Sequence, residues 1–498
     1  MAKVSAIQNN FNGGEISPLL YGRPDVDRYK TGLKTCLNFI PLVQGPVERR
    51  PGTGFIKEVK TSSLSTRIFR FEFSTTQAYI IEFGNLYCRF YKDNGAILGA
   101  NKTISGATAA NPCVITATSH GLTNGVEVYI DSVVGMTELN GKYYKIKNKA
   151  THTFELTDID DTNINSSSFT AYSSAGTAAQ TIELTTTYTT AQLFQLKFAQ
   201  SADILYVVHP SHKPRKISRT SDTAWSITDI TFSDGPFLNT NVETTTLELS
   251  ATSGSVTVTA SAVTGINGGS GFLATDIGRL IRWKDAAANQ TFLTITARAD
   301  TTHVTATIDG PNASATTATI NWRLGVWSAT TGYPSVVTFH QNRLCFAGST
   351  DFPQRVDMSR TGDFENFAPT ELDATVVDDN AVTNNLSADT VNAIRWITDD
   401  EKGLLIGTVG GEWILRPSDT GGVTTPANVQ SKRSSAYGSG NIQPIRAGRA
   451  VLFVQRALRK VRELAYVFED DGFRAPDLTL VAEHVSRTGV VDITYQTE

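Results

Sequence analysis

The fold class is decided by short runs such as Val336-Val-Thr-Phe339 and Asn342-Arg-Leu-Cys-Phe346. Both runs are rich in β-branched and aromatic residues, and a polar turn separates them. Such pairs are typical of antiparallel strands joined by a tight turn. Similar runs recur on either side of this stretch, at Ile204-Leu-Tyr-Val-Val208 and at Gly403-Leu-Leu-Ile-Gly407. We therefore predict a mainly β chain built from antiparallel meanders.

The meanders recur at a regular interval once two stretches of different composition are set aside. Residues 99–183 and 241–326 are rich in Thr, Ser and Ala, and each resembles a small β domain inserted at a loop. Without these insertions the meanders start about 44 to 58 residues apart. The expected starts lie near Arg67, Leu196, Tyr333, Val391 and Arg446. This spacing favours the blades of a β-propeller-like core, with an irregular β-sandwich as the alternative.

The first 60 residues differ from the rest and form an expected N-terminal strap that contacts an adaptor. Apolar residues recur every third or fourth position between Pro24 and Pro41, which predicts one helix in the strap. The expected domains are the strap at 1–60, a propeller-like core at 61–98, 184–240 and 327–498, and inserted β modules at 99–183 and 241–326.

Composition excludes several classes of protein. The 498 residues have a formal net charge of −4, which argues against a protein that binds nucleic acid over its whole surface. The hydrophobic fraction of 40% argues against a disordered chain. Four well-separated cysteines argue against a disulfide framework and a cysteine-rich zinc site. No apolar run reaches membrane-spanning length and residues 1–12 do not resemble a secretory signal, so we expect no membrane insertion.

Motifs for catalysis or ligand binding fail on their spacing. The stretch 135–142 has the wrong interval for a phosphate loop, and the acidic turn at 158–169 lacks the glycine and final carboxylate of a calcium loop. His209 and His212 flank Pro210 in an expected turn. The acidic clusters at 399–401 and 469–471 fall between predicted strands, where solvated turns are usual. We therefore expect no enzyme activity, cofactor or metal.

Charge is distributed in opposite blocks. Residues 430–462 contain eight basic residues and no acid, whereas residues 351–401 contain twelve acids against three basic residues. Such blocks suggest that one blade faces the next or that one subunit faces its neighbour. The expected channel, gate or inter-subunit residues are Lys432, Arg433, Arg446 and Arg449. A contact with DNA phosphates is the alternative, through a projecting loop at 431–441, although no aromatic residues interleave with the charges.

Several segments together resemble the tail tubular protein B (nozzle protein) family of short-tailed bacteriophages. They are Asn10-Phe-Asn-Gly-Gly-Glu-Ile-Ser-Pro18, Arg49-Arg-Pro-Gly-Thr53, Gln200-Ser-Ala-Asp-Ile-Leu-Tyr-Val-Val-His-Pro210, Ser359-Arg-Thr-Gly-Asp-Phe-Glu-Asn-Phe367 and Gly403-Leu-Leu-Ile-Gly-Thr-Val-Gly-Gly-Glu-Trp413. The segment 111–122 resembles the small FCCH-type β module of ubiquitin-activating enzymes, without their catalytic machinery.

The resemblance implies a structural virion protein and gives no catalytic residues. It implies a homo-oligomer, a hexameric ring that continues the tail channel, with transient passage of double-stranded DNA during genome ejection. It further implies contacts with a tail adaptor and with fibre or spike proteins, assembly in the host cytoplasm, and a gate for which the loop 431–441 is our candidate. A receptor- or glycan-binding tail module is the alternative, and a depolymerase acting through Asp399 or Asp470 is a third hypothesis.

Overall fold

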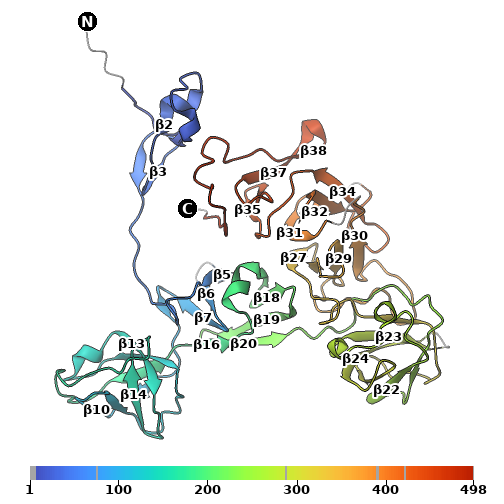
Figure 1. Cartoon of the computed structure of the whole chain (residues 1–498), viewed down its shortest axis with the longest axis horizontal. Helices are drawn as coiled ribbons and strands as arrows, with labels where there is room; N and C mark the ends of the chain where they lie inside the picture. The colour runs from blue at the N-terminus through green and yellow to red at the C-terminus, as the bar shows by residue number, and fades with distance from the viewer. Residues whose placement is uncertain (1–6, 75–76, 286–288, 389–391, 420–421, 497–498) are drawn as a thin grey trace.

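The computed structural model describes residues 7–74, 77–285, 289–388, 392–419 and 422–496 (Figure 1). These residues form a mainly β structure with short 3-10 turns, as the sequence predicts. Among them, no helix combines the length and apolarity needed to cross a bilayer.

Five antiparallel meander sheets, named I to V in chain order, form the body of the molecule. Sheet I contains β5 (Arg67–Ser74), β6 (Gln77–Gly84), β7 (Tyr87–Lys92), β8 (Gly95–Ala96) and β16 (Glu183–Thr185). Sheet II contains β17 (Lys197–Ser201), β18 (Ile204–His209), β19 (His212–Ser221) and β20 (Ala224–Asp229). The turn η4 (Thr190–Gln195) connects the two sheets.

The three remaining meander sheets lie in the second half of the chain. Sheet III contains β27 (Val336–His340), β28 (Arg343–Ala347), β29 (Arg355–Met358) and β30 (Val382–Asn385). Sheet IV contains β31 (Ile394–Asp400), β32 (Gly403–Thr408), β33 (Gly411–Arg416) and β34 (Gln430–Ser435). Sheet V contains β35 (Ile445–Ala447), β36 (Ala450–Val454), β37 (Val461–Val467) and β38 (Gly472–Arg474), with η7 (Phe468–Asp470) before the last strand.

The first strands of these sheets begin within three residues of four of the expected starts; the fifth, Val391, lies outside the described residues. The strands belong to five successive sheets arranged along an arc (Figure 1), not to the two facing layers of a sandwich.

A separate hydrophobic cluster lies between each pair of consecutive sheets, so the sheets pack face to face. Phe90 of sheet I stacks on Trp225 of sheet II at a centroid distance of 4.1 Å. In β32, Leu404 belongs to the cluster between sheets III and IV, whereas Leu405 belongs to the cluster between sheets IV and V. Because alternate side chains of a strand point to opposite faces, this strand is buried on both sides. That burial explains the continuous apolar run Gly403-Leu-Leu-Ile-Gly407.

Two further sheets with cores of their own lie at the lower corners of Figure 1. The first has seven strands: β9 (Lys102–Thr103), β10 (Gly106–Ala107), β11 (Val114–Thr116), β12 (Glu127–Asp131), β13 (Lys142–Lys147), β14 (Thr153–Thr157) and β15 (Thr177–Gln180), with the turn η3 (Thr137–Leu139). The second has six strands: β21 (Leu247–Leu249), β22 (Ser255–Ala260), β23 (Leu280–Lys284), β24 (Gln290–Arg298), β25 (His303–Ile308) and β26 (Trp322–Leu324), with the turns η5 (Asn267–Gly269) and η6 (Ala274–Asp276).

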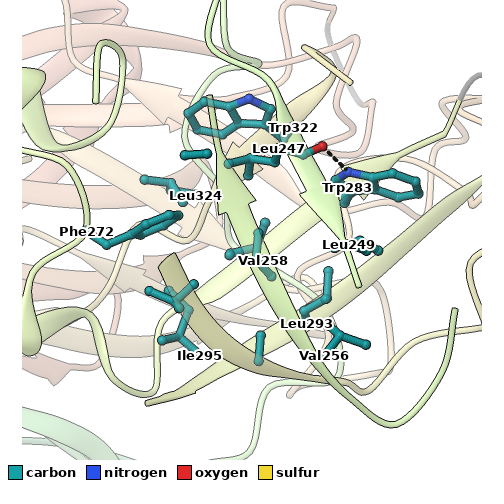
Figure 2. Close-up of a cluster of buried hydrophobic side chains, with 14 of the residues drawn as sticks. Leu247, Leu249, Val256, Val258, Phe272, Trp283, Leu293, Ile295, Trp322 and Leu324 are labelled. Atoms are coloured by element: carbon teal, nitrogen blue, oxygen red, sulfur yellow. Dashed lines mark hydrogen bonds between the residues drawn. The ribbon is translucent and has the colours of Figure 1, made fainter. Parts of the chain in front are cut away.

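The core of the six-stranded sheet includes two buried tryptophans (Figure 2). The indole N–H of Trp283 donates to the carbonyl of Leu247 at 3.1 Å, and that of Trp322 donates to the carbonyl of Thr245 at 3.0 Å. Both polar atoms of these large side chains are therefore satisfied within an apolar cluster.

The strap is less regular than expected. Its elements are β1 (Gly14–Glu15), η1 (Pro18–Leu20), η2 (Asp27–Thr31), β2 (Gly32–Leu33), β3 (Phe39–Pro41) and β4 (Val47–Arg49). The expected helix between Pro24 and Pro41 is reduced to the 3-10 turn η2, a correction to the sequence prediction. The following residues form β2 and β3 because β2 pairs in parallel with β1 and β3 forms a hairpin with β4.

Candidate functional site

The first strands of sheets II, III and IV lie next to one another. Strand β17 contacts β27, and β27 contacts β31. The side-chain amide of Gln443, just before β35, donates to the carbonyl of Phe198 at 2.9 Å, and its oxygen accepts from the Phe198 amide at 3.1 Å. Sheet II is thereby tied to the segment that enters sheet V, although about 245 residues separate the two partners.

Lys197 is a buried cation on β17, with 2% of its surface exposed. Its Nζ donates to the carbonyl of Asn441 at 2.9 Å. Burial, followed by the positive charge of Arg67, lowers the pKa of Lys197 to about 7, although Asp492 opposes the change. The side chain of Lys197 therefore changes between its charged and neutral forms near neutral pH.

Arg67 holds three separate parts of the chain together. One Nη donates to the carbonyls of Leu193 and Leu196, at 3.1 and 2.7 Å, and Nε donates to a carboxylate oxygen of Asp492 at 2.9 Å. The guanidinium also lies 5.3 Å from the ring centroid of Phe198. Sheet I is thus joined to the connection before sheet II and to the C-terminal segment.

The basic residues singled out in the sequence lie on two different sheets. Lys432 and Arg433 are exposed on β34 of sheet IV. Arg446 lies on β35 and Arg449 in the turn before β36, both exposed. Arg446 forms an ion pair with Glu401 at 3.5 Å, so the basic and acidic blocks meet at one point between neighbouring sheets.

The segment 431–441 is not the projecting loop that its composition suggests. Its first half forms strand β34, and Gly438, Ser439 and Gly440 are buried. Glu412, which is fully buried, accepts hydrogen bonds from the hydroxyls of Ser435 and Ser439. The small residues therefore allow sheets IV and V to pack closely together. This packing corrects the expectation that the segment projects as a gate loop.

The acidic clusters lie at the end of strand β31, where Asp399 and Asp400 are its last residues, and at the turn η7. Asp399 interacts with the buried imidazole of His340, and Asp470 forms an ion pair with Arg474. His209 is buried in β18, and burial lowers its pKa to about 4, with a further effect of His212. In the described part of the chain, no three His, Cys, Asp or Glu side chains gather as metal ligands would.

A buried ion network, which sequence reasoning missed, joins the seven-stranded sheet to sheet I and to the end of the strap. Glu127 on β12 pairs with Arg89 on β7 at 3.0 Å and with Lys57. Arg89 also pairs with Glu183 at 2.9 Å, and Glu183 accepts from Lys60 at 2.5 Å. These residues are far apart in the sequence. No local pattern of charges within a strand predicts that they contact one another. The network fixes the position of the seven-stranded sheet on sheet I.

Two hollows lie between elements. A cavity of about 200 Å³ is lined by Lys213, Phe232, Leu280 and Trp327, between sheet II and the six-stranded sheet. A groove of about 860 Å³ lies between β34 and the outer strands of sheet V, where Tyr437, Glu463 and Phe473 line it.

Two family models match separate parts of the chain. The model described as bacteriophage nozzle protein matches residues 335–495, which include sheets III, IV and V. The model described as ubiquitin-activating enzyme E1 FCCH domain matches residues 111–181, within the seven-stranded sheet. The nozzle match supports a structural role in a phage tail, and no curated protein matches the sequence.

One solved structure that the comparison matches is that of a Bacteroides fragilis protein described as a candidate 6-phosphogluconolactonase. It is 11% identical, the alignment covers 76% of this chain and 93% of that chain, and the TM-score is 0.25. At this TM-score the similarity informs neither the fold nor the function.

Proposed function

We propose that this chain is a subunit of a bacteriophage tail nozzle of the tail tubular protein B type. The observation that carries the proposal is the nozzle match over residues 335–495, which covers three consecutive meander sheets. In this proposal sheets I to V form a β-propeller-like body, and copies of the chain assemble into a hexameric ring that continues the tail channel. Double-stranded DNA passes through the ring when the genome is ejected.

The packing between the sheets supports a role as a mechanically rigid channel wall. Each sheet shares an apolar cluster with the next, and Arg67 and Gln443 connect segments from opposite ends of the body. A body tied in this way opens only when several contacts break together. A channel wall under genome pressure needs such stiffness.

The net charge of the chain also supports a role as a channel for DNA. Each phosphate that a protein neutralises releases counterions and adds affinity, so a strongly basic wall would slow the passage of DNA. The net charge of −4 avoids this retention. We assign the exposed residues Lys432, Arg433, Arg446 and Arg449 to contacts between subunits; the buried glycines of segment 431–441 do not support a gate there.

The inserted sheets and the strap extend away from sheets I to V (Figure 1). We propose that residues 99–183 and 241–326 are inserted modules that contact fibre or spike proteins, and that residues 1–60 contact the tail adaptor. The FCCH match lies within the first module and supports the interpretation of that module as a separate β unit. In this proposal the assembly takes place in the host cytoplasm.

Antibody labelling of virions tests the proposal. Fab fragments raised against the full-length chain should decorate the tail and leave the capsid and the fibre tips unlabelled. Labelling at the fibre tips would instead favour the receptor- or glycan-binding alternative. Absence of the chain from purified virions would contradict the proposed function.

A further inference from the structure

The strap exposes apolar side chains that a free protein surface does not usually display together. The exposed fraction is 79% for Leu19, 71% for Leu37 and 88% for Val43. The hairpin of β3 and β4 is exposed on both faces, since Phe39 and Ile40 point in opposite directions and each is about half exposed. A two-stranded hairpin is only marginally stable in water without a further layer. The strap therefore needs a surface that covers it.

The same segment is basic. Residues 1–60 contain nine Lys or Arg residues against five acids. Arg49 lies directly across the hairpin from Phe39, and Arg50 follows it; both arginines are exposed. The surface that covers the hairpin should therefore combine apolar and acidic side chains.

A surface of this kind lies in the long connection between β29 and β30. All eight residues of segment 372–379 are exposed, and none is basic. Its apolar members are Leu372, Val376 and Val377, and its acids are Asp373, Asp378 and Asp379. Within the described ranges, none of these three carboxylates takes part in an ion pair. The segment thus presents unpaired acidic charge beside exposed apolar groups.

The backbone of this acidic segment is held firmly. The guanidinium of Arg343 donates to the carbonyls of Asp378 and Asn380, each at 2.7 Å. The side chain of Asn380 in turn accepts from the amide of Val377 at 2.8 Å. Apolar side chains on a fixed backbone lose little conformational entropy when a partner covers them. The segment is therefore preorganised as a docking surface.

The two surfaces lie on opposite sides of one molecule. The strap is fastened to the C-terminal segment, where the amide of Ser17 donates to the carbonyl of Val481 at 2.8 Å. The acidic segment leads into β30, and Arg282 of β23 donates to the carbonyl of Glu371, the residue just before the segment. Figure 1 shows β3 at the upper left and β23 and β30 at the right. Complementary patches on opposite sides produce head-to-tail contacts, which form a ring when the rotation between successive copies closes.

We propose that the β3–β4 hairpin of one copy docks on segment 372–379 of a neighbouring copy of this chain. Arg49 and Arg50 face the carboxylates of Asp378 and Asp379, and Phe39 covers Val376. This inference rests on the proposed ring assembly and specifies one contact that forms it. It gives the β3–β4 hairpin to the neighbouring copy and leaves the rest of the strap to the proposed adaptor contact.

Charge reversal in the full-length chain tests the contact, with sedimentation velocity as the readout. The variant R49E/R50E and the variant D378K/D379K should each weaken self-association about tenfold or more, because like charges then face each other. Combining the four changes should restore association toward that of the original chain. The matched controls Lys147→Glu and Glu248→Lys reverse exposed charges on the two inserted sheets and should leave association unchanged.

Cysteine cross-linking gives a second readout that does not depend on charge. In a C36S background, the pair F39C/V376C should form disulfide-linked multimers on mild oxidation, and each single variant should not. The other three native cysteines are buried. If the original chain does not self-associate, the proposed ring fails and this contact fails with it. If it self-associates, but the reversals have no effect or the cysteine pair does not cross-link, only this contact is overturned.

Discussion

The guanidinium Nε of Arg67 lies 2.9 Å from a carboxylate oxygen of Asp492, a residue 425 positions later in the chain. Arg67 begins the first strand of sheet I, whereas Asp492 belongs to the segment that follows sheet V. This ion pair therefore connects the two ends of the five-sheet body.

Removal of Arg67 should destabilise the body more than removal of Asp492. Arg67→Met removes the hydrogen bonds to the carbonyls of Leu193 and Leu196 and the ion pair with Asp492, and should cost about 3 kcal/mol. Asp492→Asn affects a side chain that is 33% exposed and should cost about 1 kcal/mol or less. Chemical unfolding monitored by tryptophan fluorescence measures both values. Equal losses would contradict the central role assigned to Arg67.

Lys197 should make stability depend on pH. Its pKa is lowered to about 7 in the folded chain, from an unfolded value near 10.5, so between these values the unfolded chain binds more protons. The free energy of unfolding attributable to Lys197 should therefore rise from pH 7 toward pH 10. Lys197→Met removes this dependence, so the stability of the original chain relative to the variant should rise from pH 7 toward pH 10, and the unfolding midpoints of both proteins across this range measure the change. A difference that stays constant across this range would show that folding does not lower the pKa of Lys197.

The buried ion network should be sensitive to one carboxylate. Glu127→Gln leaves the buried cations Arg89 and Lys57 without their shared partner and should cost about 3 kcal/mol. Glu183→Gln serves as the control, because that side chain is more exposed and should cost about 1 kcal/mol. Limited proteolysis near residues 55–60 should accelerate for Glu127→Gln only. Unchanged cleavage would mean that the network does not hold the seven-stranded sheet.

Two tryptophans provide a matched test of buried hydrogen bonding. Trp283 donates to the carbonyl of Leu247, whereas the buried indole nitrogen of Trp413 has no hydrogen-bond partner within the described ranges (Figure 2 shows the former). Both Trp→Phe changes lose volume, but only Trp283→Phe removes a hydrogen bond, after which the Leu247 carbonyl keeps the amide of Thr319 alone. Trp283→Phe should cost about 1 kcal/mol more than Trp413→Phe in calorimetric unfolding. A larger loss for Trp413→Phe would argue against this account of the six-stranded core.

The sheets could be predicted because strand propensity and turn residues are local signals. The run Gly403-Leu-Leu-Ile-Gly407 is buried on both faces, and the starts near Arg67 and Leu196 are correct to within one residue. In the strap, a helical spacing of apolar residues was misleading. Gly32 and Leu33 pair in parallel with Gly14 and Glu15, and this pairing with a distant segment overrides the local period.

The charged site could be predicted only in part, because its partners come together through tertiary structure. Local composition identified the basic residues around Arg446, but it did not reveal that Glu401 is the partner. Small residues at 431–441 suggested a projecting loop, yet the buried carboxylate of Glu412 holds Ser435 and Ser439. A distant buried acid of this kind leaves no mark on the sequence of the segment it orders.

Electron microscopy of the purified full-length chain tests the central claim most directly. The account predicts closed rings with an open central channel, in which the five meander sheets of each copy form the wall. A solution of single molecules, or assemblies without a channel, would contradict it.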